Sequence, residues 1–492
     1  MRIALLAWES LHSIAVGGVA AHTSELAETM ASKGHQVHLF TRRMQGQTAH
    51  ELINGVHYHR CSYPYYSNFV DDVNSMCRAF VDKFFEIEDF VGKFDIVHSH
   101  DWLCSNAMIW IKQGRGHKTV QTIHSTEYAR CGNAFYNGQS CRIREQERAG
   151  TFWADRVIAV SEATKKEVMW MYEVPDSKAV AIDNGVNWHR FDINVDPGQV
   201  KSQYGIAPLE PTVLFCGRLA WQKGPDILIE SIPGVLSSHH DARFIIAGDG
   251  DMMGGLKNRV NQLRIGHAVR FLGYKNGDEL IKLFKSCDVV CVPSRNEPFG
   301  IVVLEAWAAH KPVVVTENGG PGEFISHGQN GLKIYPRPDS VIWGINKIFS
   351  NFDGARQMGD NGRKCLEERF DWNIIADKTI EVYYDISPHL KPAPVAEPAP
   401  VVIESIQETK QLEPVYSVQE SVELEPVMAD DGASEAAVIE AMTSAGPVRK
   451  VTRHKKSYQN IKGELAEVTN AIYKCREKLQ QGVEGFCVPT GF

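Results

Sequence analysis

The sequence lacks the features that would assign it to several large classes of protein. No run of about 18 apolar residues occurs, so we expect no membrane-spanning helix. The 60 acidic residues outnumber the 52 lysines and arginines, which argues against a nucleic-acid-binding protein. The 11 cysteines form no CxxC pair and no zinc-binding pattern, so we expect reduced thiols in a cytoplasmic protein.

Two nucleotide-binding motifs are also missing. Neither the full GxGxxG fingerprint of dinucleotide-binding proteins nor the GxxxxGK[ST] of a P-loop occurs. The first absence argues against a nicotinamide cofactor, and the second excludes a P-loop phosphate site. A nucleotide, if one binds, must be held in another way.

Short apolar segments alternate with amphipathic, helix-like stretches in two successive parts of the chain. This alternation is typical of parallel sheets covered by helices, and two such units in series leave a cleft between them. A last amphipathic helix at 371–386 is free to pack on either unit. The expected strands are 2–8, 36–40, 95–98, 119–123 and 156–160 in the first unit, and 212–216, 243–247, 269–272, 288–292 and 312–315 in the second.

The composition changes after residue 387. Residues 388–447 hold 8 of the 22 prolines, with 11 acidic and 2 basic side chains, which predicts a disordered acidic linker. Residues 448–492 hold 9 basic and 4 acidic side chains. Apolar residues recur at spacings of three and four over 458–479, which predicts a short helix. This helix either mediates binding to a second copy or to a protein partner, or it lies on the rest of its own chain.

Two loops carry residues suited to an anion. Gly17-Gly18 lies between the first strand and a helix, where the glycines allow close backbone approach and the helix start offers free amides. Arg218 and Lys223 lie five residues apart after the first strand of the second unit. They can converge on a diphosphate, or they are solvated surface cations, and the glycines can equally serve the turn alone.

Two glutamates follow the strand at 288–292. Pro298-Phe299-Gly300 places Glu297 in a loop and Glu305 in the helix after it. Glutamates near a helix start are often dipole partners or caps. A pair of carboxylates is also typical of glycosidases, and the spacing alone does not exclude that activity.

Polar side chains follow two strands of the first unit. His98, His100 and Asp101 come at the end of one strand and His124 after the next, so each should point into the expected cleft. An HxH pair is typical of metal ligands, but no third ligand is evident, which favours a site without metal. By itself, a histidine after a strand is more often a hydrogen-bonded loop residue than a catalyst.

With these motifs together, the chain resembles the retaining glycosyltransferases of family 4. Their GT-B fold has two Rossmann-like, doubly wound α/β domains that face each other across a cleft. The resemblance covers residues 1–386, and its marks are Gly17-Gly18, GRLxxxKG from Gly217, AGDG from Ala247, PFGxxxxEA after Glu297 and GGPGE from Gly319. The segments DIVHSHDW, TIHSTEY and IDNGVNWHRF are closer to glycogen and starch synthases than to lipid mannosyltransferases.

The resemblance implies an acceptor domain at 1–187, completed by a crossover helix at 371–387, and a nucleotide-sugar domain at 188–370. The implied donor residues are Gly17, Gly18, Arg218 and Lys223 for the diphosphate, Glu305 for the ribose, Glu297 with the amides of Phe299 and Gly300 for the sugar, and Tyr274 and Lys275 for the base.

The implied catalytic residues are Glu297, His124 and Asp101. His124 would lie against the sugar with its carbonyl near the anomeric carbon, and Asp101 would lie near the acceptor. The resemblance implies no metal and no cofactor, because Arg218 and Lys223 stabilise the leaving diphosphate. It also implies that the anomeric configuration is retained.

We therefore predict an α-glucan synthase that moves glucose from UDP- or ADP-glucose to a glycogen-like chain. A sucrose-type, other small-molecule or lipid glycosyltransferase is the alternative within the family. A non-catalytic glucan-binding scaffold is the alternative outside it. The intact set of Glu297, Glu305, Arg218, Lys223 and His124 argues against the scaffold.

Overall fold

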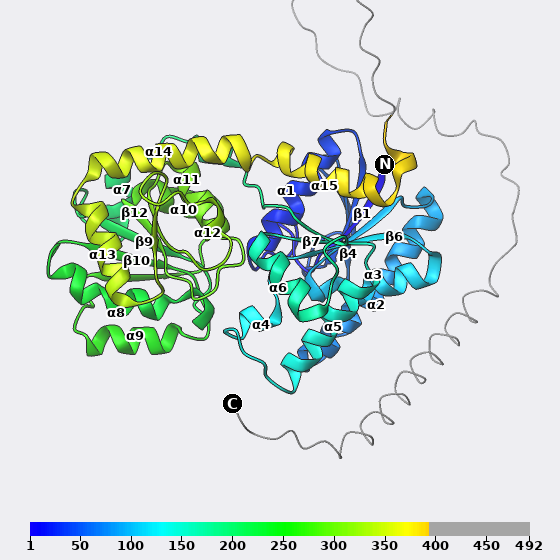
Figure 1. Ribbon diagram of the computed structural model, residues 1–492, viewed down its shortest axis with the longest axis horizontal. Helices are drawn as coiled ribbons and strands as arrows, with labels where there is room; N and C mark the ends of the chain where they lie inside the picture. Colours follow the sequence, from blue (N-terminus) through cyan, green and yellow to red (C-terminus); the bar gives the residue numbers. More distant parts are fainter. Residues whose placement is uncertain (393–492) are drawn as a thin grey trace, which may run out of the picture. The chain divides into compact units, whose positions relative to one another are not determined.

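The computed structural model describes residues 1–392, which form two β-sheets covered by helices (Figure 1). The acidic linker predicted up to residue 447, apart from its first residues, and the helix predicted at 458–479 lie outside the described residues. The predicted α/β class, with two doubly wound parallel sheets, is confirmed. No helix within residues 1–392 is both long and apolar enough to cross a membrane.

The first sheet contains the first eight strands of the chain. These are β1 (Arg2–Leu6), β2 (Gln36–Arg42), β3 (His50–Ile53), β4 (Val56–Cys61), β5 (Ile96–His100), β6 (Lys118–Ile123), β7 (Arg156–Ala159) and β8 (Ala179–Ala181). Their order is β3-β4-β2-β1-β5-β6-β7-β8, and each neighbouring pair is parallel except β3 and β4. The central strands are apolar runs such as the fully buried residues 3–6, as expected of strands covered on both faces.

Helices cover the two faces of the first sheet with separate apolar clusters. The helices of this part are α1 (Gly18–Ser32), α2 (Phe69–Val91), α3 (Asp101–Arg115), α4 (Glu127–Arg130), α5 (Gln139–Trp153) and α6 (Glu162–Tyr172). On one face α2, α3 and α5 bury side chains that include Phe84 and Ile143. On the other face α1 buries Leu26 and Met30.

An unpredicted hairpin forms one edge of the first sheet. Asn54-Gly55 joins β3 to β4, and both residues have positive φ (49° and 81°), as a type I′ turn requires. Four histidines, here called the edge cluster, lie together at this edge. They are His38 on β2, His50 on β3, and His57 and His59 on β4. These polar side chains interrupt the apolar pattern from which the other strands were predicted.

The second sheet has six parallel strands in the order β11-β10-β9-β12-β13-β14. The strands are β9 (Thr212–Cys216), β10 (Arg243–Ala247), β11 (Val269–Gly273), β12 (Val289–Val292), β13 (Val313–Thr316) and β14 (Leu332–Ile334). The helices are α7 (Pro197–Gln203), α8 (Pro225–Leu236), α9 (Met253–Gln262), α10 (Gly277–Ser286), α11 (Ile301–Ala308), α12 (Pro321–Phe324), α13 (Pro338–Phe349) and α14 (Phe352–Arg369), with short 3-10 helices at Trp188–Phe191 and Trp221–Lys223.

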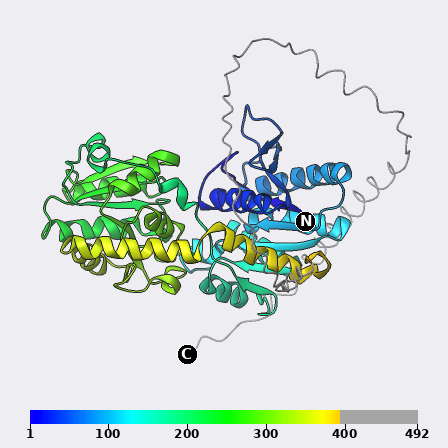
Figure 2. The same cartoon turned by 90° about the horizontal axis from the view of Figure 1, so that it is seen from above.

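The last α-helix, α15 (Trp372–Ile386), returns to the first sheet (Figure 2). It begins after Asp371, whose carboxylate accepts the amide of Asn373 (2.8 Å). It packs against α1, and Trp372 and Tyr383 join the apolar cluster of β1, β2 and β4. Of the two packings left open by the sequence, the helix takes the one on the first unit. Pro388–Leu390, placed in the linker by composition, form a short 3-10 helix directly after it.

Each of the ten predicted strands corresponds to an observed one. The strands at 212–216 and 243–247 match residue for residue. Four observed strands were not predicted: β3, β4, β8 and β14. The last two have three residues each, too few to show a pattern in the sequence.

Candidate active site

The strands of a parallel sheet all end at the same edge, and a crevice forms at that edge where the strand order reverses. In the second sheet this point lies between β9 and β12, which pair directly although they are the first and fourth strands of that sheet along the chain. Ligands of open α/β sheets bind at such a point. Lys223 follows β9 and Glu297 follows β12, so the fold brings these two predicted residues to the same place.

Lys223 and Glu297 form an ion pair there. Nζ of Lys223 lies 2.7 Å and 2.9 Å from the two carboxylate oxygens of Glu297. The hydroxyl of Ser294 donates a third hydrogen bond to Glu297, at 2.8 Å. Glu297 is only 5% exposed, and a buried carboxylate is costly unless a cation and hydrogen bonds compensate it. The pair joins positions 74 residues apart in the sequence.

Two glycines allow neighbouring loops to approach this pair. Gly319 has a φ of 88°, and a Cβ on it would lie 2.1 Å from the carbonyl oxygen of Glu297. The next residue, Gly320, donates its amide to the same carbonyl at 2.9 Å. Gly248 similarly lies against the backbone of Gly217, where a Cβ would come within 1.9 Å of the carbonyl. The glycine-rich motifs after β10 and β13 are therefore needed for close packing of backbone around the site.

Arg218 is the second predicted cation of this site. Its side chain is exposed, and no hydrogen bond or ion pair to its guanidinium is found among residues 1–392. Partial desolvation and the nearby positive charge of Arg130 lower the pKa of Arg218, while Glu297 acts in the opposite sense. A cation without a direct partner, next to another cation, is suited to bind an anion.

Glu305 lies on α11, one helix further on. Burial raises the pKa of its carboxyl to about 7, and the charge of Glu25 on α1 raises it further, against the effect of Arg190. A carboxyl group with this pKa is a mixture of the neutral and charged forms near pH 7, so it can both donate and accept a hydrogen bond.

The glycine pair of the first sheet lies close to the second. Gly18 is the first residue of α1, and a Cβ on it would lie 2.9 Å from the side chain of Ile301 on α11. The amides of Val16 and Gly17 donate to the carboxylate of Glu9, at 2.6 Å and 2.7 Å. Glu9 thus holds the loop in shape, and the free amides of the first turn of α1 begin at Gly18.

Four histidines, here called the strand-end cluster, lie at the carboxyl ends of β5 and β6: His22, His98, His100 and His124. His98 has partners for both ring nitrogens, Tyr383 Oη and Thr122 Oγ1, each at 2.7 Å. Nδ1 of His100 lies 3.2 Å from Nε2 of His124. Burial is the main cause that keeps the pKa of all four imidazoles well below the usual value, about 3 for His124.

Asp101 lies at the start of α3 with a positive φ of 55°. Its carboxylate accepts the backbone amide of His124 at 2.7 Å, and it is 8% exposed. Burial raises its pKa to about 6, although Arg130 and the amides of His124 and Ser125 lower it. The side chain therefore fixes the loop that carries His124.

The other predicted residues occupy different environments. The side chain of Phe299 is buried against Phe324 and Phe370, so only its backbone is open to a ligand. Tyr274 is half exposed in the loop after β11, and Lys275 pairs with Glu279 at 3.2 Å. Within residues 1–392, no hydrogen bond, ion pair or ring contact joins either of these two to Lys223 or Glu297.

Two residues of the site were not predicted. His22 lies one helical turn after Gly18, on α1, and the sequence offered that spacing as a signal. It forms a group of three histidines with His100 and His124, whereas His98 of the HxH pair has both ring nitrogens bonded elsewhere. Glu9 gave no signal, because its contact depends on the path of the loop after β1.

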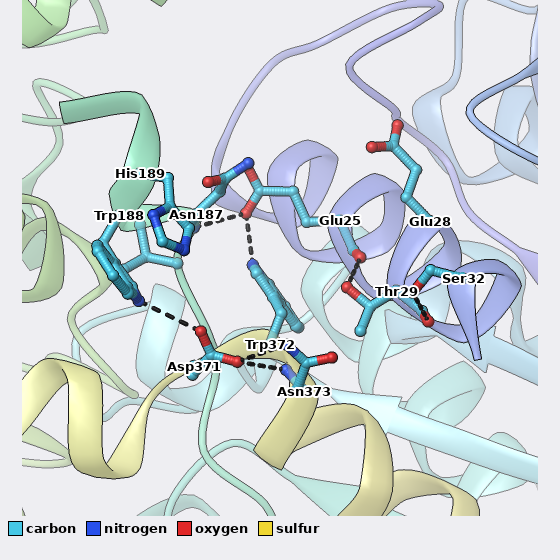
Figure 3. A pocket seen from close by; sticks show the side chains of 11 residues that line it. Glu25, Glu28, Thr29, Ser32, Asn187, Trp188, His189, Asp371, Trp372 and Asn373 are labelled. Carbon is cyan, nitrogen blue, oxygen red and sulfur yellow. Dashed lines mark hydrogen bonds between the residues drawn. The ribbon is translucent and has the colours of Figure 1, made fainter. Parts of the chain in front are cut away.

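A separate pocket of about 260 Å³ lies where the chain crosses back to the first sheet (Figure 3). Trp372 donates its indole N–H to Glu25 at 2.5 Å, and Trp188 donates to Asp371 at 3.2 Å. None of the predicted site residues lines this pocket. Its polar groups already bond to one another, so it belongs to the crossover and not to the strand-end site.

Comparison with known proteins identifies the family. Residues 16–190 match the family described as Glycosyltransferase Family 4, and residues 199–365 match Glycosyl transferases group 1. An uncharacterized glycosyltransferase of Methanocaldococcus jannaschii is 38% identical over 387 residues, which cover 78% of this chain and 98% of the relative. The chain is a family 4 glycosyltransferase.

A curated relative and a solved structure resemble this glycosyltransferase more distantly. A glycogen synthase of Mycobacterium tuberculosis is 28% identical over 399 residues, covering 78% of this chain and 94% of the relative. The structure of a sucrose-phosphate synthase of Thermosynechococcus elongatus has a TM-score of 0.67 and 22% identity, covering 79% of this chain and 99% of that chain. The second likeness shows the shared GT-B fold, and it confirms the fold that the motifs implied.

Proposed function

We propose that this glycosyltransferase transfers glucose from a nucleoside-diphosphate glucose to a growing α-glucan, with retention of configuration. The observation that carries the proposal is the placement of Arg218, Lys223 and the buried Glu297 at the point where the strand order reverses. The 28% identity to a glycogen synthase supports a glucan as acceptor, and an equal identity to a D-inositol 3-phosphate glycosyltransferase of Corynebacterium urealyticum supports the small-molecule alternative. The sucrose-type alternative has support from the fold alone.

Lys223 and Arg218 are the proposed partners of the diphosphate. Without donor, the charge of Lys223 is balanced by Glu297, at 2.7 Å and 2.9 Å. With donor bound, negative charge grows on the leaving diphosphate, and the two cations stabilise it together with the free amides at Gly18. Glu297 then turns its oxygens to hydroxyls of the donor sugar, beside the amides of Phe299 and Gly300.

Glu305 is the proposed partner of the ribose. Its carboxyl, with a pKa of about 7, has no hydrogen bond of its own in residues 1–392. The ribose hydroxyls would supply one. Tyr274 and Lys275 remain the proposed base-binding residues because the loop after β11 lies at the carboxyl edge of the same sheet.

His124 is the proposed contact of the sugar in the first domain. Its neutral imidazole can exchange a hydrogen bond with a sugar hydroxyl, and its carbonyl would face the anomeric carbon. Asp101, which we proposed near the acceptor, also acts as a positioning residue because it holds the amide of His124.

Two further assignments are proposed with this function. The nine cysteines of residues 1–392 are all free thiols, which supports a reducing compartment such as the cytoplasm. The heptad pattern at 458–479 supports a homo-oligomer or a protein partner. The proposed substrates require neither nucleic acid nor a membrane surface.

The first test is release of nucleoside diphosphate from UDP-, ADP- and GDP-sugars, with and without glycogen. We expect release from one glucose donor, and only with glycogen present. Release that is indifferent to glycogen would favour a small-molecule or lipid acceptor. No release from any donor would favour a scaffold.

The second test is Glu297→Ala in the same assay. Turnover should fall by at least about 10³-fold because the variant loses contacts to the reacting sugar, while nucleotide binding persists. Glu368→Ala, an exposed glutamate on α14, is the matched control and should keep full turnover. Full turnover of Glu297→Ala would remove this residue from the reacting site.

A further inference from the structure

Three histidines of the strand-end cluster converge from three separate elements. His22 comes from α1, His100 from the end of β5, and His124 from the loop after β6. One ring nitrogen of each lies within 4.8 Å of the other two. All three are buried, with exposed fractions of 5%, 1% and 9%.

Several polar atoms around this point have no hydrogen-bond partner. Both ring nitrogens of His22 and Nε2 of His100 are buried without one. The side chain of Asn184 faces His22, and its Oδ1 also lacks a partner of ordinary geometry. Buried polar groups in proteins are nearly always satisfied, so the unpaired ring of His22, with Asn184 beside it, indicates that a ligand completes at least one of these atoms.

The spacing of the three rings matches the donor set of a tetrahedral metal ion. Two imidazole nitrogens bound at about 2.0–2.1 Å to one tetrahedral ion lie about 3.3 Å apart. Nδ1 of His100 and Nε2 of His124 are 3.2 Å apart. The ring of His22 lies 4.5 Å from that of His124 and 5.2 Å from that of His100, edge to face in both cases. Small rotations of the rings are enough to direct one nitrogen of each to a common point.

The surroundings hold these rings in place. His98 stacks on His100 at 4.5 Å, and its own nitrogens are used by Tyr383 and Thr122, so it supports the group without competing as a ligand. Trp372, labelled in Figure 3, packs edge to face on His22 at 5.3 Å. Such outer contacts orient imidazole ligands and increase the affinity for a metal.

We propose that His22, His100 and His124 bind one divalent transition-metal ion of the zinc class. Three neutral nitrogen donors select Zn²⁺, Co²⁺, Ni²⁺ or Cu²⁺ over Mg²⁺ and Ca²⁺, which require oxygen. A fourth position remains for water or Asn184. If His124 contacts the donor sugar, as the proposed function has it, the ion and the sugar exclude each other and the ion inhibits transfer. This consequence rests on the proposed function, and the metal site itself does not.

The test is a titration of the chelator-treated full chain with Co²⁺, followed by visible absorption. Tetrahedral Co²⁺ absorbs far more strongly than the free hydrated ion. We expect one equivalent bound by the wild type, at least about 100-fold weaker binding by His22→Ala, and wild-type binding by the matched control His57→Ala. A 100-fold excess of Mg²⁺ should leave the signal unchanged. No tetrahedral signal, equal binding by His22→Ala, or displacement by Mg²⁺ would overturn the proposal.

A measurement on the wild type alone covers the case in which His22→Ala fails to fold. X-ray absorption of the zinc-loaded chain should show a nitrogen and oxygen shell at about 2.0 Å with the outer scattering of imidazole rings. A sulfur shell at about 2.3 Å would place the zinc on cysteines and overturn the proposal. Both measurements are independent of glycosyl transfer, so a failure of the proposed function would not affect them.

Discussion

The edge cluster and the strand-end cluster are two groups of histidines on one sheet, and they differ in their position along the strands. In the edge cluster the rings stack across neighbouring strands, and two pairs of nitrogens meet at 2.9 Å and 3.3 Å. In the strand-end cluster, two histidines of the same strand, β5, differ in how their ring nitrogens are paired. His98, in the strand, has both nitrogens paired, whereas His100, at its end, leaves Nε2 without a partner.

The difference teaches where a buried histidine is free to bind a ligand. Within β5, Thr122 of the neighbouring strand and Tyr383 of α15 satisfy both nitrogens of His98, and the residue serves packing. His38 inside β2 is less complete, because its Nε2 has no partner. At the carboxyl end, β1 has already stopped opposite Ser99, so one side of His100 faces the loops that follow the strands. Four predictions examine this contrast.

The largest effect is expected from His124→Ala. Loss of the proposed contact to the donor sugar should lower turnover by about 10²–10³-fold. The matched variant His57→Ala, in the edge cluster, should stay within about twofold of the wild type. The measurement is nucleoside-diphosphate release at saturating donor. Equal losses in the two variants would mean that the histidines act through stability and would break the contrast.

Acid should destabilise the protein through the edge cluster. Burial is the main cause that lowers the pKa of His38 to about 3 and of His59 to about 2. The unfolded chain binds these protons near pH 6.5. The contribution of the two neutral histidines to the free energy of unfolding is therefore fully present above that pH, and it is lost as the pH drops below it. When the pH falls from 7.5 to 5.5, each of the two histidines should lower the free energy of unfolding by about 1.4 kcal/mol.

Urea unfolding of the wild type and His59→Gln at the two pH values isolates this contribution. Glutamine cannot be protonated, so the variant should lose about 1.4 kcal/mol less than the wild type on acidification. The same loss in both proteins would show that His59 does not titrate as its burial requires.

A smaller effect is expected from Tyr383→Phe. The substitution removes the hydroxyl that pairs with Nδ1 of His98 and leaves that buried nitrogen without its partner. The free energy of unfolding should fall by about 1–2 kcal/mol, measured from the urea midpoint at pH 7.5. An unchanged midpoint would mean that pairing within the strand contributes nothing to the difference between His98 and His100.

The smallest effect is expected from His50→Ala. His50 is exposed on β3, and its one ring hydrogen bond is a 3.3 Å contact with His57. Stability should change by less than about 0.5 kcal/mol and turnover not at all. A loss above 1 kcal/mol would show that the edge cluster acts as one unit, including its exposed member.

The sequence was most informative where apolar runs and glycine motifs coincide. β9 and β10 are each followed directly by a glycine, Gly217 and Gly248, and their ends were predicted without error. Five of the ten residues of β3 and β4 are His, Glu or Arg, so the apolar pattern is absent although Asn54-Gly55 is a strong hairpin signal. A strand could therefore be predicted from the sequence where both of its faces are buried by apolar side chains. It could not be predicted where polar side chains on neighbouring strands pair with one another.

The site was predictable residue by residue but not as a set of contacts. Motif order indicated Lys223 and Glu297 as separate donor residues, and nothing in a spacing of 74 shows that they pair. Asp101 was expected near the acceptor, and its bond to the His124 amide depends on a positive φ that the sequence does not reveal. His22 was missed because its spacing of one helical turn from Gly18 places it on the same face of α1 but does not show which strand ends that face meets.

The return of α15 to the first sheet has a consequence for synthesis on the ribosome. Trp372 and Tyr383 complete the apolar cluster of β1, β2 and β4, yet they are made about 200 residues after β8 ends at Ala181. At about 5–20 residues per second, this face of the nascent first domain stays open for about 10–40 s. The whole second sheet and its helices, up to Arg369 at the end of α14, are made in that interval, so the first domain stays incomplete until the second has been synthesised.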